Sequence, residues 1–136
     1  YTLQDLLPEI ESDFVIYQGG PVEQDNLYFV HQVPELIPES IKVDNGIFWG
    51  GNFESLKKLL SDGSLNKNDI RFFLGYSGWG KNQLEDELNS NSWFISENDI
   101  KNIFSKNEES LWKNKILQQG GDYKLWANAP SDINLN

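Results

Sequence analysis

Residues 71–93 read RFFLGYSGWGKNQLEDELNSNSW, and this stretch decides the fold. It begins with an apolar, aromatic run that favours a strand. Three glycines then follow within six residues, at Gly75, Gly78 and Gly80. Glycine at this density predicts a sharp turn or a close backbone contact, because a residue without Cβ adopts positive φ freely. Leu84 and Leu88 lie four residues apart and predict a helix, so the stretch reads as strand, glycine corner and helix.

The chain before this stretch alternates between short helices and strands. Thr2 and Asp5 have the spacing of a capping box and predict a short helix over residues 3–7. Strands are expected at residues 14–17 and 27–33, on either side of a glycine-proline loop. Residues 41–43 and 47–49 flank Asp44-Asn45-Gly46, which predicts a hairpin with a type I′ turn. Asn52 is expected to cap a helix carrying Phe53, Leu56 and Leu60 on one face and ending at Gly63.

The chain after this stretch predicts further elements and completes the fold class. Strands are expected at residues 92–96 and 122–127. A second capping box at Ser96 and Asp99 predicts a helix with Ile100, Ile103 and Phe104 on its apolar face. A further helix is expected after Asn107, with Leu111, Trp112 and Ile116 buried. Trp93 and Trp112 are expected in the core. The pattern predicts an α+β fold, in which a mixed, mostly antiparallel sheet with flanking helices forms one domain over residues 1–136.

Composition restricts the class of partner. The 136 residues carry a formal charge of −10 and one arginine, Arg71, so direct binding to duplex DNA is not expected. No apolar run approaches the ~18 residues of a membrane span. The absence of cysteine excludes a disulfide, a thiolate metal site and a thiol nucleophile, and it favours a cytoplasmic protein. The sequence predicts no cofactor, no metal and no catalytic residue.

Several motifs in a fixed order resemble the AlgH/YqgE family of bacterial proteins. The motifs are GGPVEQ at residues 19–24, a strand with His31, Gly50-Gly51, FLGYSGWG at residues 73–80, QLE at 83–85, Trp93 and Leu111-Trp112. The resemblance implies an α+β fold and a protein described as a transcriptional regulator, with no known biochemical activity. Members of this family typically carry a further N-terminal segment. This chain is expected to lack that segment, which would leave an unpaired sheet edge or an uncovered apolar face. A homo-oligomer, or another chain that fills the gap, is therefore expected.

The two glycine-rich loops are the expected ligand or partner surface. Its residues are Gly19, Gly20, Pro21, Glu23, His31, Gly75, Tyr76, Ser77, Gly78, Trp79, Gly80 and Gln83. The segment around Ser77 does not match the G-x-S-x-G nucleophile motif, because Trp79 stands where that motif needs glycine. The glycine spacing also reverses that of a dinucleotide-binding loop. Residues 62–73 lack the glycine and glutamate of a calcium loop. Glu23 and Asp25 are more consistent with a solvated acidic loop than with a metal site.

Three functions remain open from the sequence. The first is a non-enzymatic binding or interaction protein that presents Tyr76, Trp79 and Glu23 to an unknown partner. The second is a regulator that acts through another protein rather than through DNA. The third is a small-molecule-binding protein or enzyme with a site between residues 19–24 and 75–80. A pocket lined by Tyr76, Trp79 and His31 would favour the third function, and a flat aromatic patch the first.

Overall fold

The computed structural model describes residues 1–96, 103–104 and 117. The backbone divides into two units, Tyr1–Phe94 and Ile95–Asn136. Nearly all described residues belong to the first unit. The helices and the last strand expected after Ser96 lie outside the described residues, apart from Ile103 and Phe104. The assignment of the whole chain to one domain stays a prediction.

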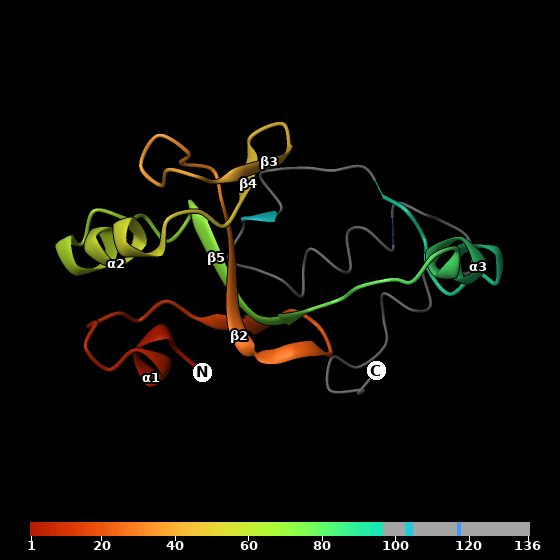
Figure 1. Cartoon of the computed structure of the whole chain (residues 1–136), viewed down its shortest axis with the longest axis horizontal. Coiled ribbons are helices and arrows are strands. Elements are labelled where there is room, and N and C mark those ends of the chain that lie inside the picture. Colours follow the sequence, from red (N-terminus) through yellow and green to blue (C-terminus); the bar gives the residue numbers. More distant parts are fainter. Residues whose placement is uncertain (97–102, 105–116, 118–136) are drawn as a thin grey trace. The chain divides into compact units, whose positions relative to one another are not determined.

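A five-stranded sheet organises the first unit, and its mixed, mostly antiparallel pairing confirms the α+β class (Figure 1). The strands are β1 (Ile16–Gln18), β2 (Val22–His31), β3 (Ile41–Asp44), β4 (Ile47–Trp49) and β5 (Ile70–Tyr76). Their order across the sheet is β1-β5-β2-β4-β3. Only β1 and β5 pair in parallel; the other neighbours are antiparallel. The central strands β2 and β5 are therefore the framework on which the other strands are added.

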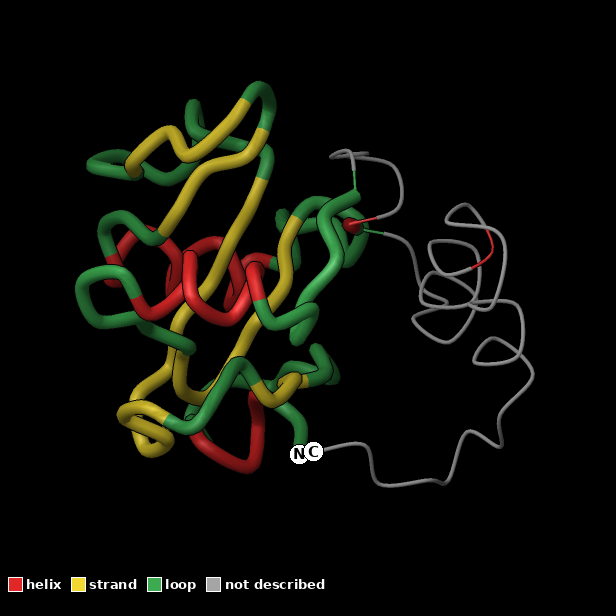
Figure 2. The backbone as a smooth tube through the Cα atoms, turned by 90° about the vertical axis from the view of Figure 1, so that its right-hand side faces the viewer, coloured by secondary structure: helices red, strands yellow, loops and turns green. Residues whose placement is uncertain are grey.

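Register assigns the strand residues to two faces of the sheet. Phe29 pairs with Phe72 and His31 with Ile70, so these side chains share one face. This face is the core, where they pack with Leu3 of α1 (Leu3–Leu6) and Leu56 of α2 (Phe53–Asp62). Figure 2 shows the strands side by side and these helices as red segments against them. The opposite face carries the alternate residues Tyr28, Val30, Trp49 and Phe73.

Local capping sets the ends of the two helices that cover the core face. The Thr2 amide donates to the Asp5 carboxylate at 2.8 Å, which confirms the expected contact at the start of α1. The Asn52 side chain accepts from the Ser55 amide at 2.9 Å and caps α2. Gly63 ends α2 with φ of 68°, in the left-handed region. The expected helix 53–63 is confirmed, although Phe53 lies at the surface rather than in the core.

The order strand, glycine corner, helix is confirmed for the central stretch. β5 ends at Tyr76, and α3 (Gln83–Asn89) begins after the remaining glycines. Gly75 has φ of 74° and lies within β5, whereas Gly78 and Gly80 have no positive φ. Leu84 is exposed and α3 buries no residue, so the expected apolar face of this helix has no core partner within the described residues.

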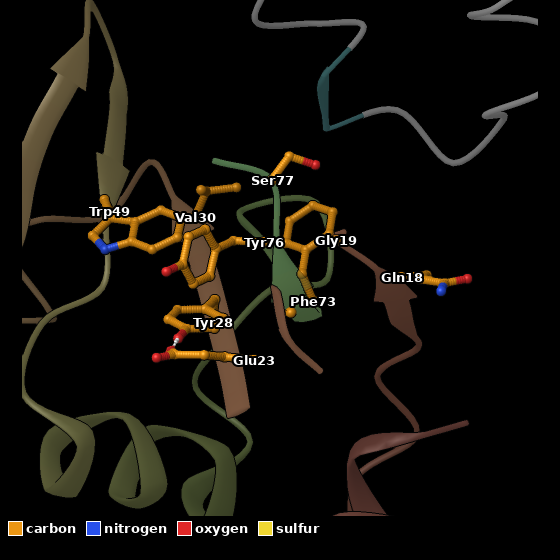
Figure 3. Close-up of a pocket in the computed structure, with 10 residues that line it drawn as sticks. Gln18, Gly19, Glu23, Tyr28, Val30, Trp49, Phe73, Tyr76 and Ser77 are labelled. Carbon is orange, nitrogen blue, oxygen red and sulfur yellow. Dashed lines mark hydrogen bonds between the residues drawn. The ribbon is translucent and has the colours of Figure 1, made fainter. Parts of the chain in front are cut away.

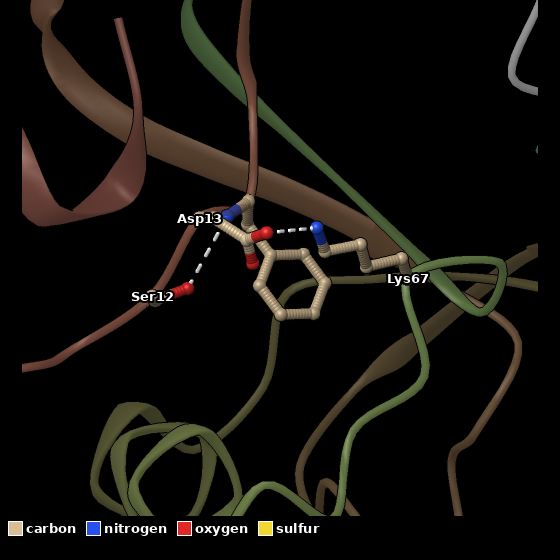
Figure 4. Close-up of polar contacts among 4 residues, drawn as sticks. Ser12, Asp13 and Lys67 are labelled. Atoms are coloured by element: carbon tan, nitrogen blue, oxygen red, sulfur yellow. Dashed lines mark hydrogen bonds and ion pairs between the residues drawn. The ribbon is translucent and has the colours of Figure 1, made fainter.

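An ion pair joins the segments that precede the two parallel strands β1 and β5. Lys67 donates to the carboxylate of Asp13, and the Phe14 amide donates to Ser12 Oγ at 3.4 Å (Figure 4). The Lys67 ammonium lowers the pKa of the Asp13 carboxyl group below its ordinary value. Both side chains are largely exposed, so the pair aligns the two segments but adds little stability.

Four details of the sequence predictions are wrong. Residues 92–96 form no strand, and Trp93 is 52% exposed rather than part of the core. The hairpin between β3 and β4 is present, but only Gly46 of its turn has positive φ, so the type I′ turn is not formed. The first strand begins at Ile16 rather than at Phe14, because the Phe14 carbonyl oxygen accepts from the Leu3 amide instead of joining the sheet. The Phe14 ring packs edge-on against the ring of Phe72.

Candidate functional site

An interruption in the pairing of β2 and β5 shapes the candidate site. Val22 pairs with Tyr76 and Leu27 pairs with Leu74, with a register shift between them. Residues 23–26 of β2 therefore lie opposite one residue of β5, Gly75. Extra residues on one strand form a bulge that bends the chain away from the ladder. The bulge lifts Glu23 out of the sheet, and Glu23 has φ of 48°, a conformation that non-glycine residues seldom adopt.

Glycines make the close approach of the bulge and its neighbouring loop possible. A Cβ atom on Gly75 would lie 2.5 Å from the carbonyl oxygen of Gly20 and 2.9 Å from that of Val22. A Cβ atom on Gly19 or Gly20 would overlap with the backbone of Gly75 or Tyr76. The Gly19 amide also donates to the Leu74 carbonyl oxygen at 2.8 Å. The two glycine-rich loops that the sequence singled out are thus packed directly against each other.

Aromatic side chains form the floor of the site on the sheet face opposite the helices. The rings of Tyr28 and Trp49 are stacked, with centroids 5.5 Å apart and planes 27° apart. The rings of Tyr28 and Tyr76 are also 5.5 Å apart but nearly perpendicular, at 78°. Both geometries are favourable for aromatic pairs. Tyr28 is therefore the central ring of a three-ring cluster.

Glu23 places a carboxylate beside this cluster. The Tyr28 hydroxyl donates to Glu23 Oε2, and the Asn26 side-chain amide donates to the same oxygen at 3.2 Å. Figure 3 shows the Tyr28 hydroxyl directed at the Glu23 carboxylate. The bond to Glu23 raises the pKa of the Tyr28 hydroxyl, because the carboxylate favours the protonated phenol over the phenolate. The bulge and these two bonds together fix the position of the negative charge.

These elements line an open pocket of about 610 Å³. Its lining combines the aromatic floor, the Glu23 bulge and the end of β5 (Figure 3). The lining residues are Gln18, Gly19, Glu23, Tyr28, Val30, Trp49, Phe73, Gly75, Tyr76 and Ser77. The volume is within the ~300–1,000 Å³ range of sites that bind small molecules.

The structure places only some of the expected site residues in this pocket. Those that line it are Gly19, Glu23, Gly75, Tyr76 and Ser77. Gly20 and Pro21 belong to the supporting loop, and the Pro21 carbonyl oxygen accepts from the Gln24 side chain. The floor residues missing from the sequence prediction are Tyr28, Val30, Trp49 and Phe73. Alternation within β2 could have shown that Tyr28 and Val30 share a face, but their pairing with Trp49 and Phe73 required the register.

Three of the other expected residues, Trp79, Gly80 and Gln83, belong to a separate cluster around α3, whereas Gly78 lies in the loop between β5 and α3. The indole nitrogens of Trp79 and Trp93 donate to Glu87 Oε2 at 3.1 and 2.6 Å. The two rings pack edge to face with centroids 5.9 Å apart. Gln83 donates to Glu87 at 3.0 Å and accepts from the Gly80 amide at 2.9 Å. These donors lower the pKa of the Glu87 carboxyl group, Trp93 having the largest effect.

His31 lies in the core and does not reach the pocket. Its side chain is fully buried, with Nε2 2.9 Å from the Gly50 carbonyl oxygen. Its Nδ1 accepts from the Val33 amide at 3.2 Å. This pair of bonds requires the neutral imidazole with its proton on Nε2. Burial accordingly lowers the pKa of His31, although the bond to Gly50 opposes the shift. His31 is therefore a satisfied core histidine rather than a base for Ser77.

The arrangement suits binding of a molecule with an apolar surface and a group that complements a carboxylate. Within the described residues, no three histidine, cysteine, aspartate or glutamate side chains gather as they would around a metal ion. Over the same residues, no helix is both long enough and apolar enough to cross a membrane. The hydrogen-bond donors to the Glu23 carboxylate are the side chains of Tyr28 and Asn26.

A mixed five-stranded sheet, with α1 and α2 on one face and an aromatic pocket on the other, defines an α+β protein. The sequence profile described as AlgH-like matches residues 1–124, and the chain belongs to this family. A UPF0301 protein of Cytophaga hutchinsonii is 45% identical over 122 residues, which are 89% of this chain and 67% of that protein. A UPF0301 protein of Chlorobium limicola is 40% identical over 121 residues, covering 89% of this chain and 65% of the relative. The chain thus spans about two thirds of these relatives.

Two solved structures share the fold at low sequence identity. A crystal structure of a Corynebacterium diphtheriae protein has a TM-score of 0.67 and 18% identity, over 94% of this chain and 70% of that one. The solution structure of the AlgH protein from Pseudomonas aeruginosa has a TM-score of 0.66 and 23% identity, over 94% of this chain and 69% of that one. These neighbours support the expected AlgH/YqgE resemblance at the level of the fold.

Proposed function

We propose that this chain is a non-enzymatic binding protein that holds a small organic molecule in the pocket between residues 19–24 and 75–77. The observation that carries the proposal is the aromatic floor on the sheet face opposite α1 and α2, bordered by the Glu23 bulge. Specific sites for small molecules are typically concave, largely apolar and equipped with a few fixed polar groups. Here Glu23 is the fixed polar group, and Tyr28, Trp49 and Tyr76 supply the apolar surface.

The geometry favours a small molecule in the pocket over a protein partner that contacts both glycine-rich loops. Tyr76 and Glu23 line the pocket, but Trp79 belongs to the cluster around Glu87. The three side chains expected to form one surface therefore divide between two places. The concave part contains two of them together with three further rings, those of Tyr28, Trp49 and Phe73.

The polar side chains that line the pocket fit ligand recognition better than catalysis. A serine nucleophile needs an adjacent base within hydrogen-bond reach. Ser77 lies in the lining, but both ring nitrogens of His31 are committed to backbone groups in the core. Glu23 already accepts from Tyr28 and Asn26, an arrangement that fixes the carboxylate as a recognition group.

A fragment screen by ligand-observed NMR on the intact chain tests this function. We expect hits that compete for one site and lose binding in Ser77→Trp, which places an indole at the pocket wall. Ser64→Trp is the matched control, because Ser64 is exposed in the loop after α2 and does not line the pocket. The proposal fails if no fragment depends on Ser77, or if both variants affect binding equally.

A second candidate function is an interaction with a protein partner at the Trp79–Trp93 pair. The two side chains are 42% and 52% exposed although they pack against each other. Exposed tryptophans fixed by hydrogen bonds resemble the anchors of protein interfaces. A regulator that acts through another protein, the role implied by the family resemblance, would use such a surface. Capture of the same partner by the native chain and by Trp79→Ala would contradict it.

A further inference from the structure

We propose that the ligand of this pocket is a small organic cation of the quaternary or methylated ammonium class, held against the rings of Tyr28, Trp49 and Tyr76 with the Glu23 carboxylate as its counter-charge. This inference rests on the proposed binding function and names its ligand class. The two proposals fail under different experimental outcomes.

The ring cluster supplies the electrostatic surface that such a cation requires. Tyr28 packs against Trp49 with nearly parallel planes and against Tyr76 with nearly perpendicular planes, each at a centroid distance of 5.5 Å. All three rings also line the pocket. The faces of aromatic rings carry negative potential, and tryptophan and tyrosine attract cations more strongly than phenylalanine does. Several rings around one cavity are the usual recognition surface for methylated ammonium groups.

The Tyr28–Glu23 bond adds to this negative potential. A phenol that donates to a carboxylate has a more electron-rich ring, so the bond strengthens the attraction of Tyr28 for a cation. Glu23 is the only one of the ten lining residues with a charged side chain at neutral pH, and its charge is negative. The formal charge of the whole chain, −10, attracts a cation in the same sense.

The same features disfavour other ligand classes. A neutral apolar ligand would remove water from the Glu23 carboxylate without replacing its interactions, which is costly. An anion would be repelled by that carboxylate at short range. A compact primary ammonium group needs several hydrogen-bond acceptors to replace its hydration shell. A quaternary ammonium group has no N–H donor and is satisfied by ring faces and one nearby negative charge.

Choline and its neutral isostere 3,3-dimethyl-1-butanol test the charge requirement on the unmodified chain. The two probes have nearly the same shape, so any difference in their dissociation constants reports the positive charge. Calorimetric or NMR titration is expected to show that choline binds at least about tenfold more tightly than the alcohol, a factor equivalent to ~1.4 kcal/mol. Tetramethylammonium should compete with choline.

Variants then assign the effect to this pocket. Glu23→Gln should weaken choline binding about tenfold and leave binding of the alcohol unchanged. Glu54→Gln removes the same charge from the exposed first turn of α2 and should leave both affinities unchanged. Trp49→Leu should also weaken choline binding, because it removes one ring of the cluster. Thermal unfolding of each variant checks that the fold is retained.

The outcomes separate the cation proposal from the proposed binding function. Equal affinity for choline and the alcohol would overturn the cation proposal and leave the binding function intact. Failure of both probes, while fragments still bind in a Ser77-dependent manner, would have the same meaning. If no probe or fragment depends on Ser77, both proposals fall. If Glu23→Gln and Glu54→Gln lose the same affinity for choline, the net charge of the chain rather than the pocket causes the loss.

Discussion

A Cβ atom on Gly19, in the loop between β1 and β2, would overlap with the carbonyl oxygen of Gly75 in β5. In the other direction, a Cβ atom on Gly75 would meet the carbonyl oxygen of the next residue, Gly20, at 2.5 Å. The loop before β2 and the end of β5 therefore occupy space that only glycine leaves free. This contact holds the bulge with Glu23 beside the aromatic floor, so the fold and the candidate site depend on it together.

Gly75→Ala is expected to destabilise the protein by about 2–4 kcal/mol. The reason is twofold: φ at this residue is 74°, and the new Cβ atom would clash with backbone oxygen atoms that have no freedom to move aside. Urea unfolding followed by tryptophan fluorescence measures the loss.

Gly78→Ala is the matched control for this substitution. Gly78 has no positive φ, and its nearest neighbour would be the Tyr76 ring at 3.4 Å, an ordinary contact. We expect a change within ~0.5 kcal/mol. Equal losses for Gly75→Ala and Gly78→Ala would show that the glycine-rich segment is sensitive as a whole and that the close packing at Gly75 is not the cause.

Local signals in the sequence were sufficient for most of the fold between Thr2 and Asn89. Capping residues and glycines determine helix ends through bonds to neighbouring backbone groups, and Asn52 and Gly63 behave in this way. The expected strand at residues 92–96 failed for a different reason. Its apolar side chains favoured a strand by composition, but Trp93 instead bonds to Glu87 of α3. Composition alone carries no information on that contact.

The candidate site was less accessible from the sequence, because it depends on register. The glycine-rich loops were recognisable, and five of their residues do line the pocket. The ring cluster joins Tyr28 of β2, Trp49 of β4 and Tyr76 of β5. No local rule fixes which residues of three strands lie opposite one another when a bulge shifts one of the ladders.

Lowering the pH below 6.5 is expected to destabilise the protein through His31. The pKa of this histidine is lowered from its ordinary value of 6.5 in the folded state, so the unfolded chain takes up a proton first. The stabilisation is complete above pH 6.5 and declines as the pH falls toward the folded-state pKa. Urea midpoints between pH 7.5 and 5.5 should therefore decrease with pH.

His31→Gln separates this effect from other titrations. The chain contains one histidine, and the carboxyl groups of Asp5, Asp13 and Glu87 have lowered pKa values, so they titrate at lower pH. Glutamine removes the titrating group, and the variant should be less stable at pH 7.5 but nearly independent of pH in this interval. A native midpoint that stays constant from pH 7.5 to 5.5 would contradict the buried, neutral state of His31.

Duplex DNA is expected to bind only weakly at physiological salt. Its affinity for proteins depends on lysine and arginine side chains that displace counterions from phosphates. Here the formal charge is −10, and Arg71 is buried with its guanidinium donating to the Lys67 and Ile70 carbonyl oxygens. Anisotropy titration of a labelled duplex measures the affinity. Submicromolar binding that weakens steeply with salt would overturn this expectation.

Trp93→Ala is expected to cost less than about 1.5 kcal/mol, because its side chain is 52% exposed. Phe72→Ala provides the comparison: Phe72 is fully buried in the core, and its loss should cost about 3–5 kcal/mol. Urea unfolding of both variants gives the two values under the same conditions. Similar losses would show that Trp93 is as buried in solution as Phe72.

The pKa of the Glu87 carboxyl group shows whether the hydrogen bond from Trp93 forms in solution. The Trp93 indole donates to Glu87 Oε2 at 2.6 Å and is the main cause of the lowered pKa of that carboxyl group. Trp93→Phe keeps an aromatic ring beside Trp79 but removes the N–H donor, so the pKa of Glu87 should rise toward its ordinary value. Titration of the carboxyl carbon by NMR measures this shift. Trp49→Phe, which removes an indole from a different part of the protein, should leave the pKa of Glu87 unchanged. If Trp93→Phe also leaves it unchanged, the indole of Trp93 does not bond to Glu87, and the exposed tryptophan pair loses the contact that orients it.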